Sequence, residues 1–229
     1  MTVVPKASTA TAAGSPVYCS GPMFSEGDKF EQKEVAAALE SAGYTTYLPQ
    51  RDGIEVGRIM HLVDHPILEG YVADKIMLEV RKWVFALDMY QLLSRCHSVV
   101  FNLDGRTPDD GSVVETAAAF AAGKPIVIYK TTPITMLAGA DNPMVQGLSS
   151  TWTYVDELKA LPPAVANAVS AAPSYTYGPP ANIALLVSEG KLIWEILEDL
   201  RGMPTDTSHE LAAFLNKIGK ALSKRPAHA

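Results

Sequence analysis

Residues 98–115 read SVVFNLDGRTPDDGSVVE, and this stretch decides the fold. The apolar run Ser98–Phe101 gives way to acids and turn-forming residues, and an alanine-rich helical pattern opens near Ser112. A strand, a loop and a helix start in this order mark the place where open α/β sheets bind ligands. The stretch contains one basic residue, Arg106, and four acidic residues: Asp104, Asp109, Asp110 and Glu115. Because this much negative charge repels phosphate, the stretch favours a neutral, hydroxyl-rich ligand or a metal ion.

The rest of the chain repeats the alternation of strand and helix. Strands are predicted at Pro16–Ser20, Tyr44–Leu48, Ser98–Leu103, Pro125–Lys130 and Thr151–Val155. Helices are predicted at Asp28–Ala42, Asp74–Cys96 and Ser112–Ala122, and from Asp156 onwards. Such alternation predicts an α/β fold in which a five-stranded parallel sheet lies between two layers of helices. We expect a flavodoxin-like or Rossmann-like three-layer sandwich with strand order 2-1-3-4-5.

The two ends of the chain differ from this alternating part. Residues 1–15 are rich in Ala, Thr and Ser and lack the apolar core of a secretory signal, so we expect a disordered tail. Residues 16–160 are predicted to form the α/β domain. Residues 161–229 are expected to form a linker and a C-terminal helical extension. In that extension the linker is Pro162–Pro180, and the helices lie near Ala181–Leu200 and Ser208–Leu222. The apolar sides of these helices need a partner surface, either the domain or another subunit.

Composition excludes several classes of protein. The net charge is −6 and the basic residues do not cluster, which argues against a nucleic-acid partner. No apolar run reaches the roughly 18 residues that a membrane span requires, so no membrane association is expected. The chain has only two cysteines, Cys19 and Cys96, which fits a reducing, cytoplasmic location.

Motifs for cofactors are missing from the sequence. No Gly-x-Gly-x-x-Gly follows the first predicted strand, and Gly123-Lys124-Pro125 is a turn rather than a phosphate-binding loop. His61 and His65 are four residues apart, but Pro66 and nearby glycines disfavour the helix that would bring them to one metal ion. We therefore expect neither a cofactor nor a bound metal.

Glu115 has two interpretations. Ser112 and Glu115 have the spacing of a capping box, in which the glutamate accepts a hydrogen bond from the amide of the cap residue. Alternatively, a carboxylate in the first turn of a helix stays ionised near the positive end of the helix dipole. An ionised and positioned carboxylate can act as a nucleophile toward the electrophilic carbon of a sugar. Both roles remain open at this point.

Asp88 stands out because it lies beside an apolar stripe on its predicted helix. The stripe contains Val80, Val84, Leu87 and Leu92. If Asp88 faces the core, burial raises the pKa of its carboxyl and favours an acid–base role. If it turns outward, it meets Lys82 or Arg95 in solvent.

Four more residues fall at the carboxyl edge of the predicted sheet. Tyr18 lies on the first strand and Gln50 follows the second, while Met23 and Phe24 come just after the first strand. Met23 and Phe24 could stack on a flat ligand, or simply pack within their loop. A tyrosine in a strand, such as Tyr18, is more often a packing residue than a catalytic one.

Together these residues resemble the nucleoside 2-deoxyribosyltransferase family, over roughly residues 16–160. The matching segments are Tyr18–Phe24 (YCSGPMF), Leu48-Pro49-Gln50, Asp88, Asn102–Gly105 (NLDG), Asp109-x-Gly111 with Glu115 six residues after the aspartate, Gly123-Lys124-Pro125 and Asn142-Pro143-Met144. Their order and spacing are more specific than any single motif.

The resemblance implies a pentosyltransferase that moves 2-deoxyribose between nucleobases, as in nucleotide salvage. Glu115 would attack the anomeric carbon and form a glycosyl ester, and an incoming free base would displace it with net retention. Tyr18 would hold and tune the carboxylate. Asp88 would hydrogen-bond or protonate the departing base.

The resemblance also implies how the deoxynucleoside is bound. Gln50 would contact the base and Asp109 the sugar hydroxyls, while Gly21, Met23 and Phe24 would line the substrate site. Asn142 would reach into the site of a neighbouring subunit, so the enzyme would be a homo-oligomer.

Two departures from the family pattern leave alternatives open. The family often has glycine two residues after the glutamate, where this chain has Ala117, and the tail after residue 160 is longer than in compact members. A related branch hydrolyses nucleoside 5′-monophosphates, but the first loop has no arginine for a phosphate, which favours a free nucleoside. The alternatives are an N-glycoside hydrolase of nucleosides or their monophosphates, and a non-catalytic nucleoside-sensing module.

Overall fold

A computed structural model gives the fold and describes residues 3–5, 16–54, 70–105, 108–135, 139–172 and 175–201. The chain forms two compact units. The first combines Met1–Gly53 with Gln91–Ala181, and the second combines Ile54–Tyr90 with Asn182–Ala229. The first unit contains the sheet, so the α/β fold is assembled from two stretches of sequence that residues 54–90 separate.

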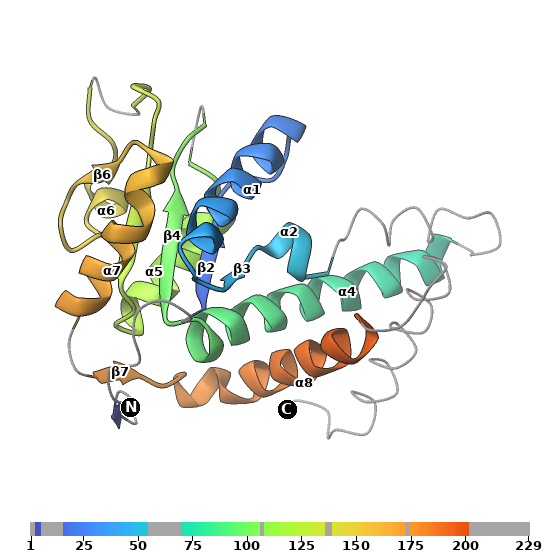
Figure 1. The fold of residues 1–229 in the computed structure, drawn as a ribbon. Helices are drawn as coiled ribbons and strands as arrows, with labels where there is room; N and C mark the ends of the chain where they lie inside the picture. Colours follow the sequence, from blue (N-terminus) through green and yellow to red (C-terminus); the bar gives the residue numbers. More distant parts are fainter. Residues whose placement is uncertain are drawn as a thin grey trace. The chain divides into compact units, whose positions relative to one another are not determined.

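The centre of the first unit is a five-stranded sheet whose strands are all parallel (Figure 1). The strands are β2 (Val17–Ser20), β3 (Thr46–Tyr47), β4 (Ser98–Asn102), β5 (Ile126–Tyr129) and β6 (Tyr154–Val155). Their order in the sheet is β3-β2-β4-β5-β6, which is the predicted order 2-1-3-4-5. Every residue of β2, β4 and β5 is buried, as expected for parallel strands covered on both faces.

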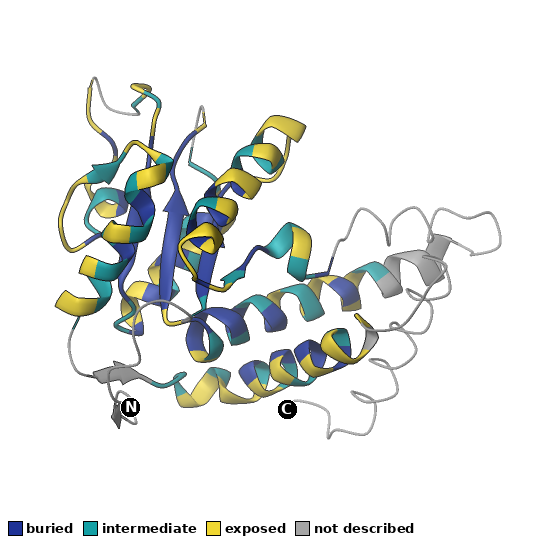
Figure 2. Ribbon diagram, viewed as in Figure 1, coloured by how far each residue is buried: buried dark blue, intermediate teal, exposed yellow. Residues whose placement is uncertain are grey.

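The alternation of side chains along β2 decides which residues face which layer of helices. The helices that cover the sheet are α1 (Glu26–Ser41), α5 (Asp110–Ala121) and α7 (Leu161–Ala171). Val17 and Cys19 lie in one hydrophobic core with residues of α1 and α7. Tyr18 and Ser20 therefore point to the opposite face, where their hydroxyls reach α5. Figure 2 shows that the sheet and the inner sides of these helices are buried.

Helix α7 corrects the expectation of a linker at Pro162–Pro180. Pro162 and Pro163 fall in the first turn of α7, where a missing backbone N–H costs no hydrogen bond. Leu161 and Val165 are fully buried in the core beneath them. Composition alone suggested a linker because proline and alanine are common in both settings. The first unit thus extends beyond residue 160.

A small antiparallel pair joins the two ends of the first unit. Strand β1 (Val3–Pro5) pairs with β7 (Tyr175–Tyr177), with Val3 opposite Tyr177. The prediction of a disordered tail is therefore wrong for Val3–Pro5, because the pairing partner lies far away in the sequence where no local pattern reveals it. The rest of that tail lies outside the described residues.

The second unit is built on two long helices. Helix α4 (Gly70–Tyr90) lies beside α8 (Ala184–Leu200), which follows a 3-10 turn at Ala181–Ile183 (Figure 1). A Cβ on Gly190 would lie 1.9 Å from the carbonyl oxygen of Ala86, so glycine is what lets the two helices approach this closely. The predicted helix at Ala181–Leu200 thus has its partner surface in α4. The second predicted helix, Ser208–Leu222, lies outside the described residues.

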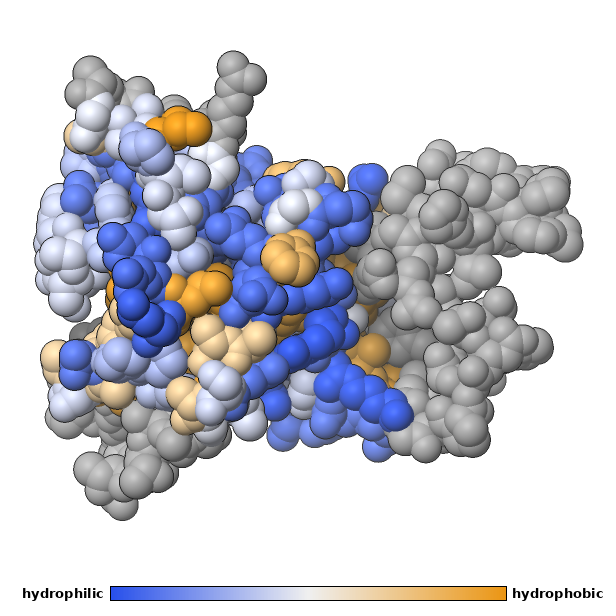
Figure 3. All heavy atoms as spheres, turned by 45° about the horizontal axis from the view of Figure 1, so that its top comes forward, coloured by the Kyte–Doolittle hydropathy of each residue, from blue (hydrophilic) through white to orange (hydrophobic). Residues whose placement is uncertain are grey.

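The predicted helix Asp74–Cys96 has two parts. Helix α4 ends at Tyr90, and a π-helical turn, η1 (Gln91–Arg95), follows in the first unit. The amide of Cys96 donates to the carbonyl of Gln91 over 2.7 Å, which is the five-residue step of a π-helix. Among the described residues, no helix is both long enough and apolar enough to cross a bilayer. On the face drawn in Figure 3, hydrophilic side chains predominate and the apolar ones form small patches.

Candidate active site

The candidate active site centres on the carboxylate of Glu115, which two hydroxyl groups hold. The phenol of Tyr18 donates a hydrogen bond to Oε1 over 2.9 Å, and the hydroxyl of Ser20 donates to Oε2 over 2.7 Å. Tyr18 and Ser20 are buried, whereas Glu115 is half-buried. Each carboxylate oxygen thus has its own donor, and the two hydrogen bonds fix the orientation of the group.

The sequence brings these three side chains together through simple periodicities. Tyr18 and Ser20 are two residues apart on β2, so they share the face that α5 covers. Glu115 lies in the second turn of α5, next to Ser112 and Thr116, which are buried against the sheet. The alternation that singles out Tyr18 therefore also identifies Ser20, which was not predicted as a site residue.

The capping-box interpretation of Glu115 is wrong. The N-cap of α5 is Asp109, whose carboxylate accepts from the amide of Ser112 over 2.7 Å and also from the Ser112 hydroxyl. Helix α5 therefore starts at Asp110, earlier than predicted, and Glu115 lies beyond the first turn. Its charge owes little to the helix dipole, which acts mainly within that turn. Its carboxylate bonds across to β2 instead.

The surroundings of Glu115 favour its neutral form more than water does. Burial is the main cause that raises the pKa of Glu115; the hydroxyls of Ser20 and Tyr18 partly offset it, the negative charge of Asp109 adds to it, and the net pKa is about 7. At neutral pH the protonated and the ionised forms of the carboxyl are therefore both populated. A carboxylate with a pKa near 7 is a stronger nucleophile, once ionised, than an ordinary glutamate.

Tyr18 is itself supported by a second aromatic ring. The ring centroids of Tyr18 and Tyr47 are 5.3 Å apart with an angle of 36° between their planes, and both side chains are fully buried. Such ring pairs contribute about 0.5–1.5 kcal/mol beyond the area they bury. Tyr47 on β3 thus fixes the ring that presents the phenol to Glu115.

Asp104 joins two loops at the carboxyl edge of the sheet rather than facing a ligand. Its carboxylate accepts from the Thr131 hydroxyl over 2.7 Å, from the Thr131 amide over 2.9 Å and from the Thr132 amide over 2.8 Å. Burial opposes ionisation, but these donors outweigh it and lower the pKa of Asp104. The loops that follow β4 and β5 are therefore held together by one ionised carboxylate. Arg106 lies outside the described residues.

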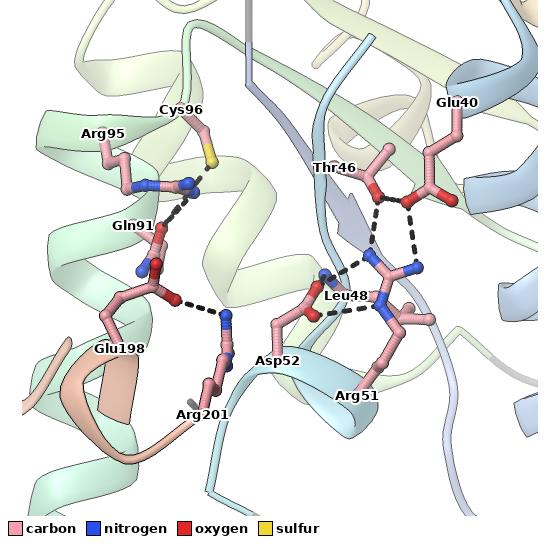
Figure 4. Close-up of polar contacts among 10 residues, drawn as sticks. All are labelled: Glu40, Thr46, Leu48, Arg51, Asp52, Gln91, Arg95, Cys96, Glu198 and Arg201. Atoms are coloured by element: carbon pink, nitrogen blue, oxygen red, sulfur yellow. Dashed lines mark hydrogen bonds and ion pairs between the residues drawn. The ribbon is translucent and has the colours of Figure 1, made fainter. Parts of the chain in front are cut away.

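Gln50 lies in a short, well-anchored helix, α2 (Pro49–Asp52), which follows β3. The guanidinium of Arg51 lies 2.9 Å from both Glu40 and Asp52, and Asp52 also accepts from the amide of Leu48 (Figure 4). The Gln50 amide nitrogen donates to the carbonyl of Lys29 over 2.8 Å. Its buried oxygen, Oε1, has no hydrogen-bond partner among the described residues.

The loop after β2 contains the other predicted residues of the substrate site. A Cβ on Gly21 would lie 1.5 Å from the side-chain amide nitrogen of Gln32 and 2.9 Å from the Cβ of Asn102, so any other residue requires the Gln32 side chain to move. Met23 and Phe24 follow, and the Phe24 side chain is 82% exposed. Ser25 then caps α1 in a capping box with Asp28. This loop presents apolar side chains to solvent while Gly21 is buried.

Asn142 lies on a segment that a buried ion pair secures. The Lys130 ammonium is 2.7 Å from Asp141 and donates to the carbonyl of Ile134, and both charged side chains are 5% exposed. Asn142 is the N-cap of α6 (Pro143–Gln146), and its side-chain oxygen accepts from the Met144 amide. Asn142 and Met144 are exposed.

Asp88 is half-buried on α4 and belongs to the second unit, not to the one that contains Tyr18, Ser20 and Glu115. The first unit thus brings together Glu115 and Tyr18 of the predicted catalytic residues, with Ser20 added. Asp109 is the N-cap of the helix on which Glu115 lies, and its charge acts on the Glu115 carboxyl.

The described residues include possible metal ligands and two cysteines, and their arrangement bears on metal and thiol chemistry. In the part of the chain that the structure describes, no three His, Cys, Asp or Glu side chains gather as metal ligands. His61 and His65 lie outside the described residues. Cys19 and Cys96 are buried, and burial raises the pKa of both thiols, so neither is poised as a thiolate.

Comparison with known proteins gives one family match. A sequence model described as nucleoside 2-deoxyribosyltransferase matches residues 17–156. No curated protein matches the chain. A conserved protein from Enterococcus faecalis V583 is 21% identical with a TM-score of 0.48, covering 68% of this chain and 99% of its own. A 2-deoxyribosyltransferase from Bacillus psychrosaccharolyticus is 18% identical with a TM-score of 0.40, covering 65% of this chain and 90% of its own.

Proposed function

Because the chain belongs to the nucleoside 2-deoxyribosyltransferase family, we propose that it exchanges the nucleobase of 2′-deoxyribonucleosides through a covalent ester on Glu115. The observation that carries the proposal is the carboxylate of Glu115 held between the hydroxyls of Tyr18 and Ser20. This carboxylate has a fixed orientation and lies at the carboxyl edge of a parallel sheet, where such folds place their ligands.

The reaction proceeds in two displacements at the anomeric carbon. In the first, an oxygen of ionised Glu115 forms a bond to C1′ as the bond from C1′ to the base nitrogen breaks. The bond electrons stay on the base, which takes up a proton. In the second, a nitrogen of the incoming base attacks C1′, gives up its proton and releases the glutamate. Two inversions give net retention.

The other predicted residues have separate roles in this proposal. Asp88 supplies and recovers the proton on the base, and Tyr18 orients the nucleophile. Gln50, with its buried oxygen free to accept a hydrogen bond, contacts the base. Asp109 contacts the sugar hydroxyls. The loop of Gly21, Met23 and Phe24 covers the substrate.

Asn142 is proposed to complete the site of a second copy of the chain in a homo-oligomer. Asn142 and Met144 are exposed beside the buried pair of Lys130 and Asp141, so this segment is firmly held but uncovered. On α5 the exposed side also contains apolar residues, Val114 and Phe120. Both features suit contact with another subunit, which sedimentation or light scattering would detect.

The substrate is proposed to be a free nucleoside rather than a 5′-monophosphate. The loop that follows β2, residues 21–25, contains no lysine or arginine. A phosphate bound there would have no counterion within this loop.

The experiment is an exchange assay with and without a second base. Deoxyadenosine is incubated with the protein in the presence or absence of free cytosine or hypoxanthine, and products are separated by chromatography. Transferase activity makes the new nucleoside only when the acceptor is present. Release of deoxyribose at the same rate without acceptor identifies the hydrolase alternative instead.

A mass measurement on quenched protein tests the covalent step. A deoxyribosyl adduct is expected on the peptide that contains Glu115, and Glu115→Gln should abolish both adduct and exchange. Glu34→Gln, on the exposed side of α1, is the matched control and should retain both. If exchange continued unchanged in Glu115→Gln, Glu115 would not be the nucleophile; a chain that binds deoxynucleosides but never turns them over would be a sensing module.

A further inference from the structure

The Ser20 hydroxyl has two acceptors but only one proton. It lies 2.7 Å from Oε2 of Glu115 and 3.4 Å from the carbonyl oxygen of Ser112, one turn earlier in α5. Ser20 is 1% exposed at the last position of β2, so solvent does not compete for its hydrogen bond. Nothing in the family match assigns this residue a role.

The two acceptors differ in how they respond to the state of Glu115. A hydroxyl bonds more strongly to an ionised carboxylate than to a neutral carbonyl, so the shorter contact is preferred while Glu115 is charged. When the carboxylate is protonated or esterified, its charge is lost and the Ser112 carbonyl becomes a competing acceptor. Ser20 can therefore stay hydrogen-bonded in every state of the nucleophile.

Ser20 and Tyr18 fix the carboxylate in complementary ways. Their hydroxyls come from the same strand but bond to different oxygens of Glu115. One donor alone leaves a carboxylate free to rotate about its last bond, whereas two donors on two oxygens define its plane. Holding that plane is a condition for attack on C1′ along a fixed direction.

We propose that Ser20 is a positioning residue for glycosyl transfer, which orients the Glu115 carboxylate and favours its ionised form. The inference rests on the proposed function of Glu115 as the nucleophile. It assigns to the strand residue two positions after Tyr18 a role as large as that of the tyrosine. It also predicts that the serine acts through Glu115 and not through substrate binding.

The test compares Ser20→Ala with a matched control, Thr116→Val. The Thr116 hydroxyl is buried, directly follows Glu115 and donates to the same Ser112 carbonyl over 2.7 Å, but it does not contact the carboxylate. Both variants remove one buried hydroxyl from the same place. Only Ser20→Ala removes a donor to the nucleophile.

Adduct formation is followed by mass spectrometry in single turnovers between pH 5 and 9. Ser20→Ala is expected to slow adduct formation at pH 7 by roughly tenfold or more, which corresponds to one lost hydrogen bond to a charged group. The acid limb of the pH–rate profile of Ser20→Ala is expected to move to higher pH. The KM for the nucleoside should be unchanged. Thr116→Val should keep the wild-type pH profile, and Ser20→Gly should repeat the shift of Ser20→Ala.

The outcomes separate this inference from the proposed function. If the wild-type protein forms neither adduct nor exchanged nucleoside, the proposed function fails, and the role of Ser20 in transfer fails with it. If the wild-type protein transfers and Ser20→Ala keeps its rate and pH profile, Ser20 alone is refuted. An equal shift in Thr116→Val would likewise overturn it, because the effect would then be one of packing.

Discussion

Replacing Glu115 by glutamine should make the protein more stable at alkaline pH. Burial raises the pKa of Glu115 to about 7, whereas in the unfolded chain the group titrates near 4.5. The folded state therefore binds more protons than the unfolded state between these values, and stability falls as pH rises through this window. This loss of folding stability is absent below pH 4.5 and complete above pH 7. Glutamine has no such ionisation, so Glu115→Gln escapes the loss.

The magnitude follows from the two pKa values. Between pH 5 and pH 8 the free energy of unfolding of the wild-type protein should drop by about 2–3 kcal/mol relative to Glu115→Gln, at about 1.4 kcal/mol per unit of pKa difference. This is a large share of the stability of an ordinary domain. The glutamine keeps a carbonyl acceptor for one hydroxyl, so the fold should persist.

Urea unfolding of both proteins at pH 5, 6, 7 and 8 measures the difference. Two curves that converge at pH 5 and separate toward pH 8, with the variant the more stable, are expected. Glu34→Gln on α1 provides the exposed control. Parallel curves for wild type and Glu115→Gln would refute the reasoning, because they would show that folding does not perturb the ionisation of Glu115.

Three further predictions concern exchange activity, the ion pair and the first loop. Tyr18→Phe removes one donor to Glu115 and should slow adduct formation by about tenfold at pH 7, measured by quenched mass spectrometry; an unchanged rate would contradict the role of Tyr18. Lys130→Met alone should lower the free energy of unfolding by roughly 3–5 kcal/mol because it leaves a buried carboxylate unpaired, and Lys130→Met combined with Asp141→Leu should recover most of it in thermal unfolding. Should the single and double variants unfold alike, the pair is not coupled. Gly21→Ala should cost about 1–3 kcal/mol in urea unfolding, since a buried amide fills the space beside its α-carbon; full stability would show that this amide moves aside easily.

Much of the first unit is readable from the sequence because it depends on local periodicity. Apolar runs separated by helical patterns predict the strand order, which the sheet confirms. That order needs no knowledge of contacts between distant segments beyond the rules of parallel sheets. The pairing of Tyr18 with Glu115 is implied instead by the resemblance to the family, and the structure places their side chains within hydrogen-bond distance.

Two kinds of feature could not be predicted from the sequence: the choice between residues that compete for one role, and contacts between segments that lie far apart in the sequence. Asp109 caps α5 in preference to Ser112, and no pattern of residue types ranks two cap candidates that lie three residues apart. Ser20 is an ordinary small residue until the position of Glu115 across from β2 is known. The pairing of β1 with β7 joins residues 170 to 174 positions apart. Proline-rich composition concealed α7 because prolines are tolerated in a first turn.

Both donors to Glu115 come from one central strand, and this links the chemistry to strand pairing. If β2 slipped by one residue against β4, Val17 and Cys19 would turn toward α5 and Tyr18 and Ser20 would turn away. Both hydroxyls would be lost in a single step, so no partly assembled site could exist. Disruption of this sheet should therefore abolish activity in a single step. Activity and the native alignment of the strands should be lost together.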